Sequence, residues 1–116
     1  MKDDRVIANY LLGFNHEETM VESFGLLDDT YEFRSPGGYL GSKRDFKRWI
    51  SVASKLLYRV ELLEVVQGKG LTFALYMVMF EIPLYKSMMV TEWFVLDEGR
   101  IMSSRLLYDW SMMDRF

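Results

Sequence analysis

The stretch "DDTYEFRSPGGYLGS", residues 28–42, carries a strand signal, a turn signal and a helix start in immediate succession. Its first part, residues 28–35, alternates in polarity and places Tyr31, Phe33 and Ser35 on one side, as in a strand with one buried face. The Pro-Gly pair that follows suits the two central positions of a turn, because proline fixes φ and glycine tolerates a positive φ. The stretch therefore predicts a strand that ends at a turn and leads into a helix.

Helices are predicted on both sides of this strand. Before it, residues 4–14 repeat apolar side chains at helical spacing. Asn15 then opens a second helix, with Glu18 three positions later, as in a capping box. After the strand, Ser42 and Asp45 form the clearest helix start in the chain.

The remainder of the chain changes to a two-residue period. Four stretches, residues 58–66, 71–82, 87–96 and 100–110, are rich in β-branched, aromatic and aliphatic residues. Short turn segments separate them, so we expect antiparallel hairpins. The predicted order is α-α-β-α-β-β-β-β, an α+β architecture in which a curved antiparallel sheet wraps around three N-terminal helices. Such a cone-shaped α+β barrel has a mouth that can admit a ligand.

Composition narrows the classes of function. Half of the 116 residues are hydrophobic, which suffices for one core, and we expect residues 1–116 to form a single domain. A net charge of −3 argues against a nucleic-acid binder, which would show a basic surface. The chain has no cysteine and one histidine, His16, so we predict no metal site and no cofactor.

Membrane and export signals are not apparent in the sequence. The longest apolar run, residues 73–80, is far shorter than the roughly 18 residues that a membrane span needs. Residues 1–10 are acidic and lack the apolar segment of a secretory signal. We therefore expect a cytoplasmic protein without a membrane partner.

The element order and several landmarks resemble the SnoaL-like and ketosteroid-isomerase-like branch of the nuclear transport factor 2-like superfamily. The landmarks are the short helical pair, "LLDDTYEFRSPGG" (26–38), the "GS" before the third helix, the aromatic meander, and "EGRIMSSRLLYDW" (98–110) as the last hairpin arm. Together they cover nearly the whole chain, and the resemblance implies a cystatin-like α+β fold. Because the superfamily includes enzymes, binding proteins and association domains, the fold does not decide the function.

The resemblance also implies positions for catalytic groups, and this chain departs from them. In the isomerase branch a general-base Asp precedes the Pro that ends the first strand, and Ser35 stands there. That branch also has a protonated Asp on the fourth strand as oxyanion donor, where the predicted register puts Thr91, and a tyrosine on the first helix, which corresponds to Tyr10. The related cyclases use an Asp on the last strand, where Leu106 stands, and Asp109 should point away unless a bulge shifts the strand. The sequence therefore identifies no catalytic residue.

The inward registers are predicted to line a pocket for a small apolar or aromatic ligand. This assignment turns Met89, Thr91 and Trp93 of one strand towards the helices. The residues predicted to supply hydrogen bonds are Tyr10, Ser35, Tyr76, Thr91, Ser104 and Tyr108. The residues predicted to supply apolar walls are Phe33, Trp49, Phe80 and Trp93. In the alternative interpretation the same side chains are the ordinary core of a curved sheet.

The opposite face of the sheet is predicted to be too apolar for full solvation. Its predicted members are Met77, Met79, Glu81, Met88, Val90, Glu92, Phe94, Ser103, Arg105, Leu107 and Asp109. We therefore expect a homodimer through this outer face, with Glu92, Arg105 and Asp109 as candidate pairs at its rim. Partial exposure of the face, or its cover by residues 111–116, is the alternative.

A basic run lies at the start of the third helix. Lys43, Arg44, Lys47 and Arg48 could dock an acidic partner or a phosphate with the help of the helix N-terminus. A solvated helix face is the preferred interpretation of this run.

Three functions are compatible with these patterns. The first is non-covalent binding of a small ligand in the cone. The second is an isomerase, cyclase or lyase for a polyketide- or steroid-like substrate. It needs a carboxylate inside the cone, and Asp109, Glu92 or Glu81 would provide one only if the predicted register is wrong by one residue. The third is an association module that works through the outer sheet face.

Overall fold

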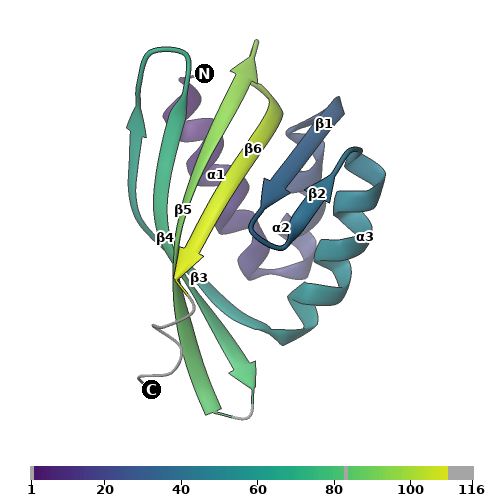
Figure 1. Ribbon diagram of the computed structural model, residues 1–116, viewed down its shortest axis with the longest axis vertical. Helices are drawn as coiled ribbons and strands as arrows, with labels where there is room; N and C mark the ends of the chain where they lie inside the picture. Colours follow the sequence, from purple (N-terminus) through teal and green to yellow (C-terminus); the bar gives the residue numbers. More distant parts are fainter. Residues whose placement is uncertain (1, 83, 110–116) are drawn as a thin grey trace.

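The computed structural model describes residues 2–82 and 84–109. The elements are α1 (Asp3–Leu12), the 3-10 turn η1 (Gly13–Asn15), α2 (Glu17–Gly25), β1 (Leu27–Ser35), β2 (Gly38–Leu40), α3 (Lys43–Ala53), the 3-10 turn η2 (Ser54–Leu56), β3 (Leu57–Gln67), β4 (Thr72–Ile82), β5 (Leu84–Asp97) and β6 (Arg100–Asp109). Figure 1 shows a curved sheet with α1 and α2 behind its strands and α3 beside β1 and β2. The predicted α+β class is confirmed, and the short strand β2 is added to the predicted order.

The six strands form one sheet in the order β2-β1-β6-β5-β4-β3, which does not close. β1 runs parallel to β6, and the other neighbours pair antiparallel, so the sheet is mixed where the sequence predicted antiparallel strands alone. The parallel pair arises because the chain passes through α3 and three further strands before β6 returns beside β1. The edge strand β3 has two irregularities in its pairing with β4, between Leu57 and Arg59 and between Leu62 and Glu64.

The turn and helix start that follow β1 are as predicted. Ser35 pairs with Gly38 across the two-residue turn, so β1 and β2 form a tight hairpin. The Ser42 hydroxyl accepts a hydrogen bond from the Asp45 backbone N–H at 3.1 Å, which satisfies one of the free donors at the start of α3. This local chemistry fixes where α3 leaves the hairpin.

Asn15 does not open α2, which begins at Glu17. The side-chain amide of Asn15 instead donates to the Val60 carbonyl at 2.9 Å and accepts from the Val60 N–H at 2.6 Å. An asparagine side chain carries both a donor and an acceptor, so it completes the backbone hydrogen bonding of this strand residue. The prediction of Asn15 as a cap was wrong because β3, 45 residues away, offers the better pair of partners.

Helix α1 packs against the concave face of the sheet. Val6, Ile7, Tyr10 and Leu11 are buried there, at the helical spacing that the sequence shows. Among the described residues, no helix is long and apolar enough to cross a membrane.

The register of β5 differs from the prediction by one residue. The β4–β5 hairpin pairs Tyr76 with Val90 and Val78 with Met88, so even-numbered residues of both strands share the concave face. From Met88 to Phe94 the buried residues of β5 are Met88, Val90, Glu92 and Phe94, all four of which were predicted on the outer face. The residues that were predicted to face the helices, Met89, Thr91 and Trp93, lie on the outer face instead.

On β6 the predicted inner register holds over most of the strand. Ser104 is buried, and Leu106 and Tyr108 are half-buried on the same side. Near the start of the strand an irregularity in the pairing with β5 shifts the register, so Ile101 is buried where Met102 was predicted.

Candidate functional site

A cavity of about 580 Å³ lies between the helices and the concave face of the sheet. Its lining comes from α1, α3, β1, β2 and the inner register of β3 to β6, and most of the lining side chains are aliphatic or aromatic. Among the described lining residues, Glu92 is the single one whose side chain can carry a full charge near neutral pH. The cavity is therefore an apolar chamber with one acid in its wall.

Most of the predicted pocket residues meet in this lining. They are Tyr10, Phe33, Ser35, Trp49, Tyr76, Phe80 and Tyr108. Ser104 is buried directly behind the lining and contacts it through hydrogen bonds. Contact of these residues with a ligand stays a prediction.

Thr91 and Trp93 do not belong to the cavity. Thr91 is exposed and Trp93 is half-buried on the outer face of β5. Their predicted orientation was wrong because both registers of this strand are almost equally apolar, and the hairpin pairing with β4 selects the other one.

Glu92 is the residue that the sequence interpretation placed on the wrong side of the sheet. Its side chain is 3% exposed, and its Oε1 atom accepts a hydrogen bond from the Tyr76 hydroxyl at 2.6 Å. The Ser104 side chain forms a second hydrogen bond with the carboxyl group. Glu92 is therefore unavailable as a rim charge of an outer-face contact. One signal in the sequence could have identified Glu92: the family resemblance implies an acid at the position of Thr91, one residue away.

Burial raises the pKa of Glu92 to about 7, although the hydrogen bonds from Tyr76 and Ser104 act in the opposite direction. Loss of hydration disfavours the charged form, and two neutral donors compensate for it in part. The carboxyl group is therefore present in both protonation states near neutral pH.

Two further tyrosines extend this polar cluster. The Tyr31 hydroxyl lies 2.6 Å from the Ser104 Oγ, and the Tyr10 side chain is hydrogen-bonded to Tyr31. Burial raises the pKa of both tyrosines, and the nearby Glu92 charge adds to the effect. These five residues, Tyr10, Tyr31, Tyr76, Glu92 and Ser104, are called the Glu92 cluster below.

An aromatic wall lies across the cavity between β1 and α3. The ring centroids of Phe33 and Trp49 are 5.4 Å apart, and Phe46 lies 5.1 Å from Phe33. Trp49 is 44% exposed, so one side of its ring remains open to solvent. Ser35 stands at the end of β1, where its hydroxyl accepts from the Gly37 N–H at 3.2 Å. The wall is thus apolar and contributes no acid.

No family model and no curated protein matches the chain. Solved structures do match over nearly its whole length. A nuclear transport factor 2-like protein of unknown function from Cytophaga hutchinsonii has 14% identity and a TM-score of 0.75, over 94% of this chain and 91% of its own. The chain has the nuclear transport factor 2-like fold. The resemblance inferred from the sequence is confirmed at the level of the fold.

Two further structures with this fold are similar to the chain. A LEH-like epoxide hydrolase from M. tuberculosis has 16% identity and a TM-score of 0.81, over 97% of this chain and 86% of its own. IdmH, a proposed polyketide cyclase from Streptomyces antibioticus, has 14% identity and a TM-score of 0.80, over 99% and 97%. At these identities the likeness shows a shared fold and leaves the chemistry to the residues of the cone.

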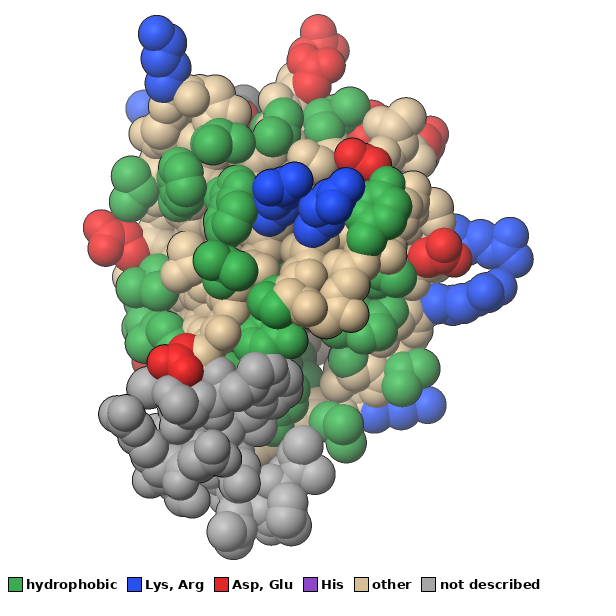
Figure 2. All heavy atoms as spheres, viewed as in Figure 1, with side chains coloured by type: hydrophobic (Ala, Val, Ile, Leu, Met, Phe, Trp, Pro, Cys, Tyr) green, Lys and Arg blue, Asp and Glu red, His purple; other side chains and the backbone are tan. Residues whose placement is uncertain are grey.

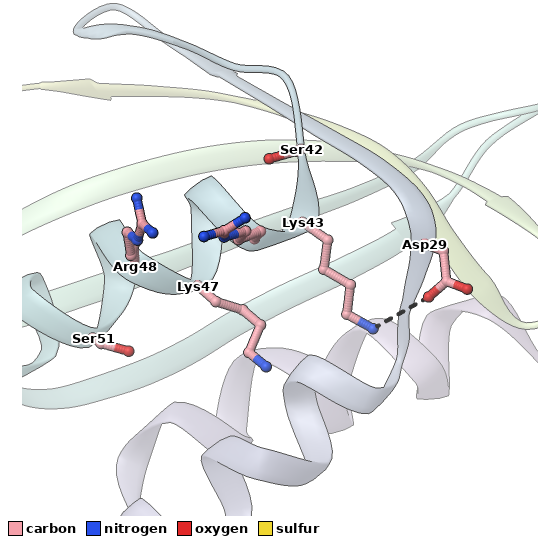
Figure 3. A pocket seen from close by; sticks show the side chains of 7 residues that line it. Asp29, Ser42, Lys43, Lys47, Arg48 and Ser51 are labelled. Carbon is pink, nitrogen blue, oxygen red and sulfur yellow. Dashed lines mark ion pairs between the residues drawn. The ribbon is translucent and has the colours of Figure 1, made fainter.

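A second, open hollow lies on the outer side of α3, away from the cone (Figure 3). Its lining includes Lys43, Lys47 and Arg48, and Figure 3 shows the Lys43 ammonium directed towards Asp29 at 4.0 Å. The same ammonium donates to the Leu27 carbonyl at 3.0 Å. Lys47 and Arg48 are exposed, which agrees with a solvated helix face.

Proposed function

We propose that the protein binds a small, largely apolar molecule in the cone, with Glu92 as the polar anchor. The observation that carries this proposal is the cavity of about 580 Å³, whose lining is mostly apolar and has, among the described residues, a single carboxyl group. Cavities that bind small molecules have this composition, with apolar walls that supply affinity and a few polar groups that fix orientation.

The aromatic wall favours a flat ligand. Phe33, Phe46 and Trp49 present neighbouring rings to the cavity, with centroids 5.1 to 6.1 Å apart. Stacking and edge contacts with such rings add to the gain from apolar burial. Glu92 on the sheet would then receive the polar group of the ligand.

Binding is tested with N-phenyl-1-naphthylamine, an apolar dye that fluoresces when it leaves water. We expect the dye to bind the wild-type protein, and a cavity-filling Ala53→Phe variant to bind it at least about tenfold more weakly, because Ala53 lines the cone. Val52→Phe adds the same ring at an exposed position one residue away, so its affinity should equal that of the wild type. Equal affinity in all three proteins, or no binding to the wild type, contradicts the proposal.

A second candidate function is general acid–base catalysis, as in an isomerase, cyclase or lyase acting on a polyketide- or steroid-like substrate. The observation in its favour is the Glu92 carboxyl, which faces the cavity and has a pKa of about 7. Such a group can take a proton from one carbon of a bound ligand and return it to another. The carboxylate that this function needs inside the cone is Glu92, because the predicted register of β5 was wrong by one residue.

The two candidates differ in turnover. A minimal substrate is cyclohex-3-enone, in which removal of a proton from C2 and its return to C4 produce the conjugated cyclohex-2-enone. Absorbance of the conjugated product reports the reaction. A rate above the uncatalysed rate that Glu92→Gln abolishes supports catalysis, whereas equal rates in both proteins leave binding as the function.

We also propose that the outer sheet face forms a homodimer contact. Phe73, Val95 and Leu107 are exposed on it, and Figure 2 shows hydrophobic side chains gathered over the sheet strands of this view. Arg105 and Asp109 remain its candidate rim residues. Sedimentation velocity tests the contact: Leu107→Lys should shift a wild-type dimer to the monomer.

The cytoplasmic location remains a prediction.

A further inference from the structure

We propose that the cone selects lipophilic amines, whose ammonium group pairs with the Glu92 carboxylate while their apolar part fills the chamber. The inference rests on the proposed binding function and names the class of ligand for the same cavity. It follows from three independent properties of the lining: its charge, its hydrogen-bond donors and its aromatic rings.

The first property is an acid without a cationic partner. Among the described lining residues there is no Lys, Arg or His, and the groups that hydrogen-bond to Glu92 are the neutral hydroxyls of Tyr76 and Ser104. The other titratable groups that act on the cluster are Tyr10 from α1 and Tyr31 from β1, and neither can become a cation. A buried carboxylate without a counter-ion is costly, so a ligand cation is stabilised there.

The second property is the engagement of three of the hydroxyl donors. Tyr76 donates to Glu92, Tyr39 donates to Glu32, and Ser54 donates to the Ser51 carbonyl. These three residues are among the six with a hydroxyl group in the lining, and each of the three already uses its hydroxyl hydrogen within the protein. A carboxylate has about four acceptor sites. The Tyr76 and Ser104 hydroxyls leave some acceptor sites of Glu92 unused. A ligand that brings its own N–H donors therefore matches the lining.

The third property is the number of aromatic rings in the lining. Phe14, Phe33, Trp49 and Phe80 line the same cavity from four different elements. The negative face of an aromatic ring attracts a cation, and the attraction grows when water is excluded. An anionic ligand would meet the opposite situation, because it would add a second negative charge beside Glu92.

Three naphthalene compounds of similar size test the selection. They are 2-naphthylmethylamine, a cation, 2-naphthylmethanol, which is neutral, and 2-naphthoate, an anion. By titration calorimetry at pH 8 we expect the amine to bind at least about tenfold more tightly than the alcohol, because one charge-assisted hydrogen bond in a buried site has that effect. We expect no binding of the naphthoate.

Two variants assign the preference to one side chain. Glu92→Gln keeps the shape of the side chain and should bind the amine and the alcohol equally. Glu61→Gln removes the same charge from an exposed position on β3 and should keep the tenfold preference. The wild type provides a measurement that needs no variant: the preference should shrink when the pH falls from 8 to 5.5, because the Glu92 carboxyl takes up a proton across that range.

The outcomes separate the inference from the function on which it rests. If the alcohol binds as tightly as the amine, or if the preference survives in Glu92→Gln and does not change with pH, the amine selection is refuted and binding in the cone stands. If neither the three compounds nor N-phenyl-1-naphthylamine bind the wild type, the proposed function fails, and the amine selection fails with it.

Discussion

Replacement of Glu92 by Gln should stabilise the protein relative to the wild type as the pH rises from 4.5 to 8. The pKa of Glu92 is raised by burial from an ordinary value of 4.5 to about 7. The folded state therefore holds a proton that the unfolded state has released between these two pH values. The contribution of Glu92 to stability is fully present below pH 4.5 and is lost as the pH rises through 7.

The size of the effect follows from the same two values. A difference of one unit between the pKa values of the folded and unfolded states corresponds to about 1.4 kcal/mol. The ionised Glu92 side chain therefore lowers the free energy of unfolding by about 3 kcal/mol at pH 8. Glutamine does not ionise, and its amide oxygen can accept from Tyr76 as the carboxylate does. Relative to pH 4.5, Glu92→Gln should gain up to about 3 kcal/mol over the wild type by pH 8.

Urea unfolding followed by circular dichroism measures this difference at intervals from pH 4.5 to 8.5. The other acidic groups titrate in both proteins and cancel in the difference. Glu61→Gln, at an exposed position, should differ from the wild type by less than about 0.5 kcal/mol at every pH. A difference between wild type and Glu92→Gln that stays constant across the range would refute the reasoning, because it would mean that Glu92 titrates alike in both states.

Two further substitutions probe single hydrogen bonds of the site and its support. Tyr76→Phe removes a donor to the carboxyl group, so the pKa of Glu92 should rise further and the stability at pH 8 should fall by about 1 to 3 kcal/mol, less at pH 5. Urea unfolding at the two pH values checks this, and an equal loss at both would contradict it. Asn15→Ala removes both hydrogen bonds to Val60 and should cost about 1 to 3 kcal/mol at any pH. The Val60 amide hydrogen should then exchange faster with solvent. Unchanged protection of this amide would contradict a stabilising role of the two hydrogen bonds between Asn15 and Val60.

The element order was predictable because its signals are local. The alternation in residues 28–35, the two-residue turn after it and the Ser42 cap each depend on a few neighbouring residues, and the structure has all three. The parallel pairing of β1 with β6 joins residues such as Phe33 and Ser104, which are far apart in the sequence. No local pattern specifies which distant strand a strand will join.

The site was predicted in outline and missed at its centre. Tyr10 and Tyr76 were assigned to the interior correctly, but Glu92 was assigned to the outer face because the predicted register turned Thr91 towards the helices. The two faces of β5 do not differ clearly in polarity. Thr91 and Trp93 on one face are as suitable for an interior as Glu92 and its neighbours on the other. The pairing with β4 decided the register, and Tyr76 and Ser104 made the buried acid acceptable.

The unclosed sheet that leaves the cone accessible also leaves two strand edges that pair with no other strand among the described residues. β2, at one edge, has three residues and offers little backbone for pairing. β3, at the other edge, is long, but its two irregularities break the regular ladder, and Arg59, Glu61 and Glu64 are exposed along it. A strand from another molecule would have to match these bulges and bring charges against charges. The protein thus gains an accessible interior without a flat edge on which further chains could stack into aggregates.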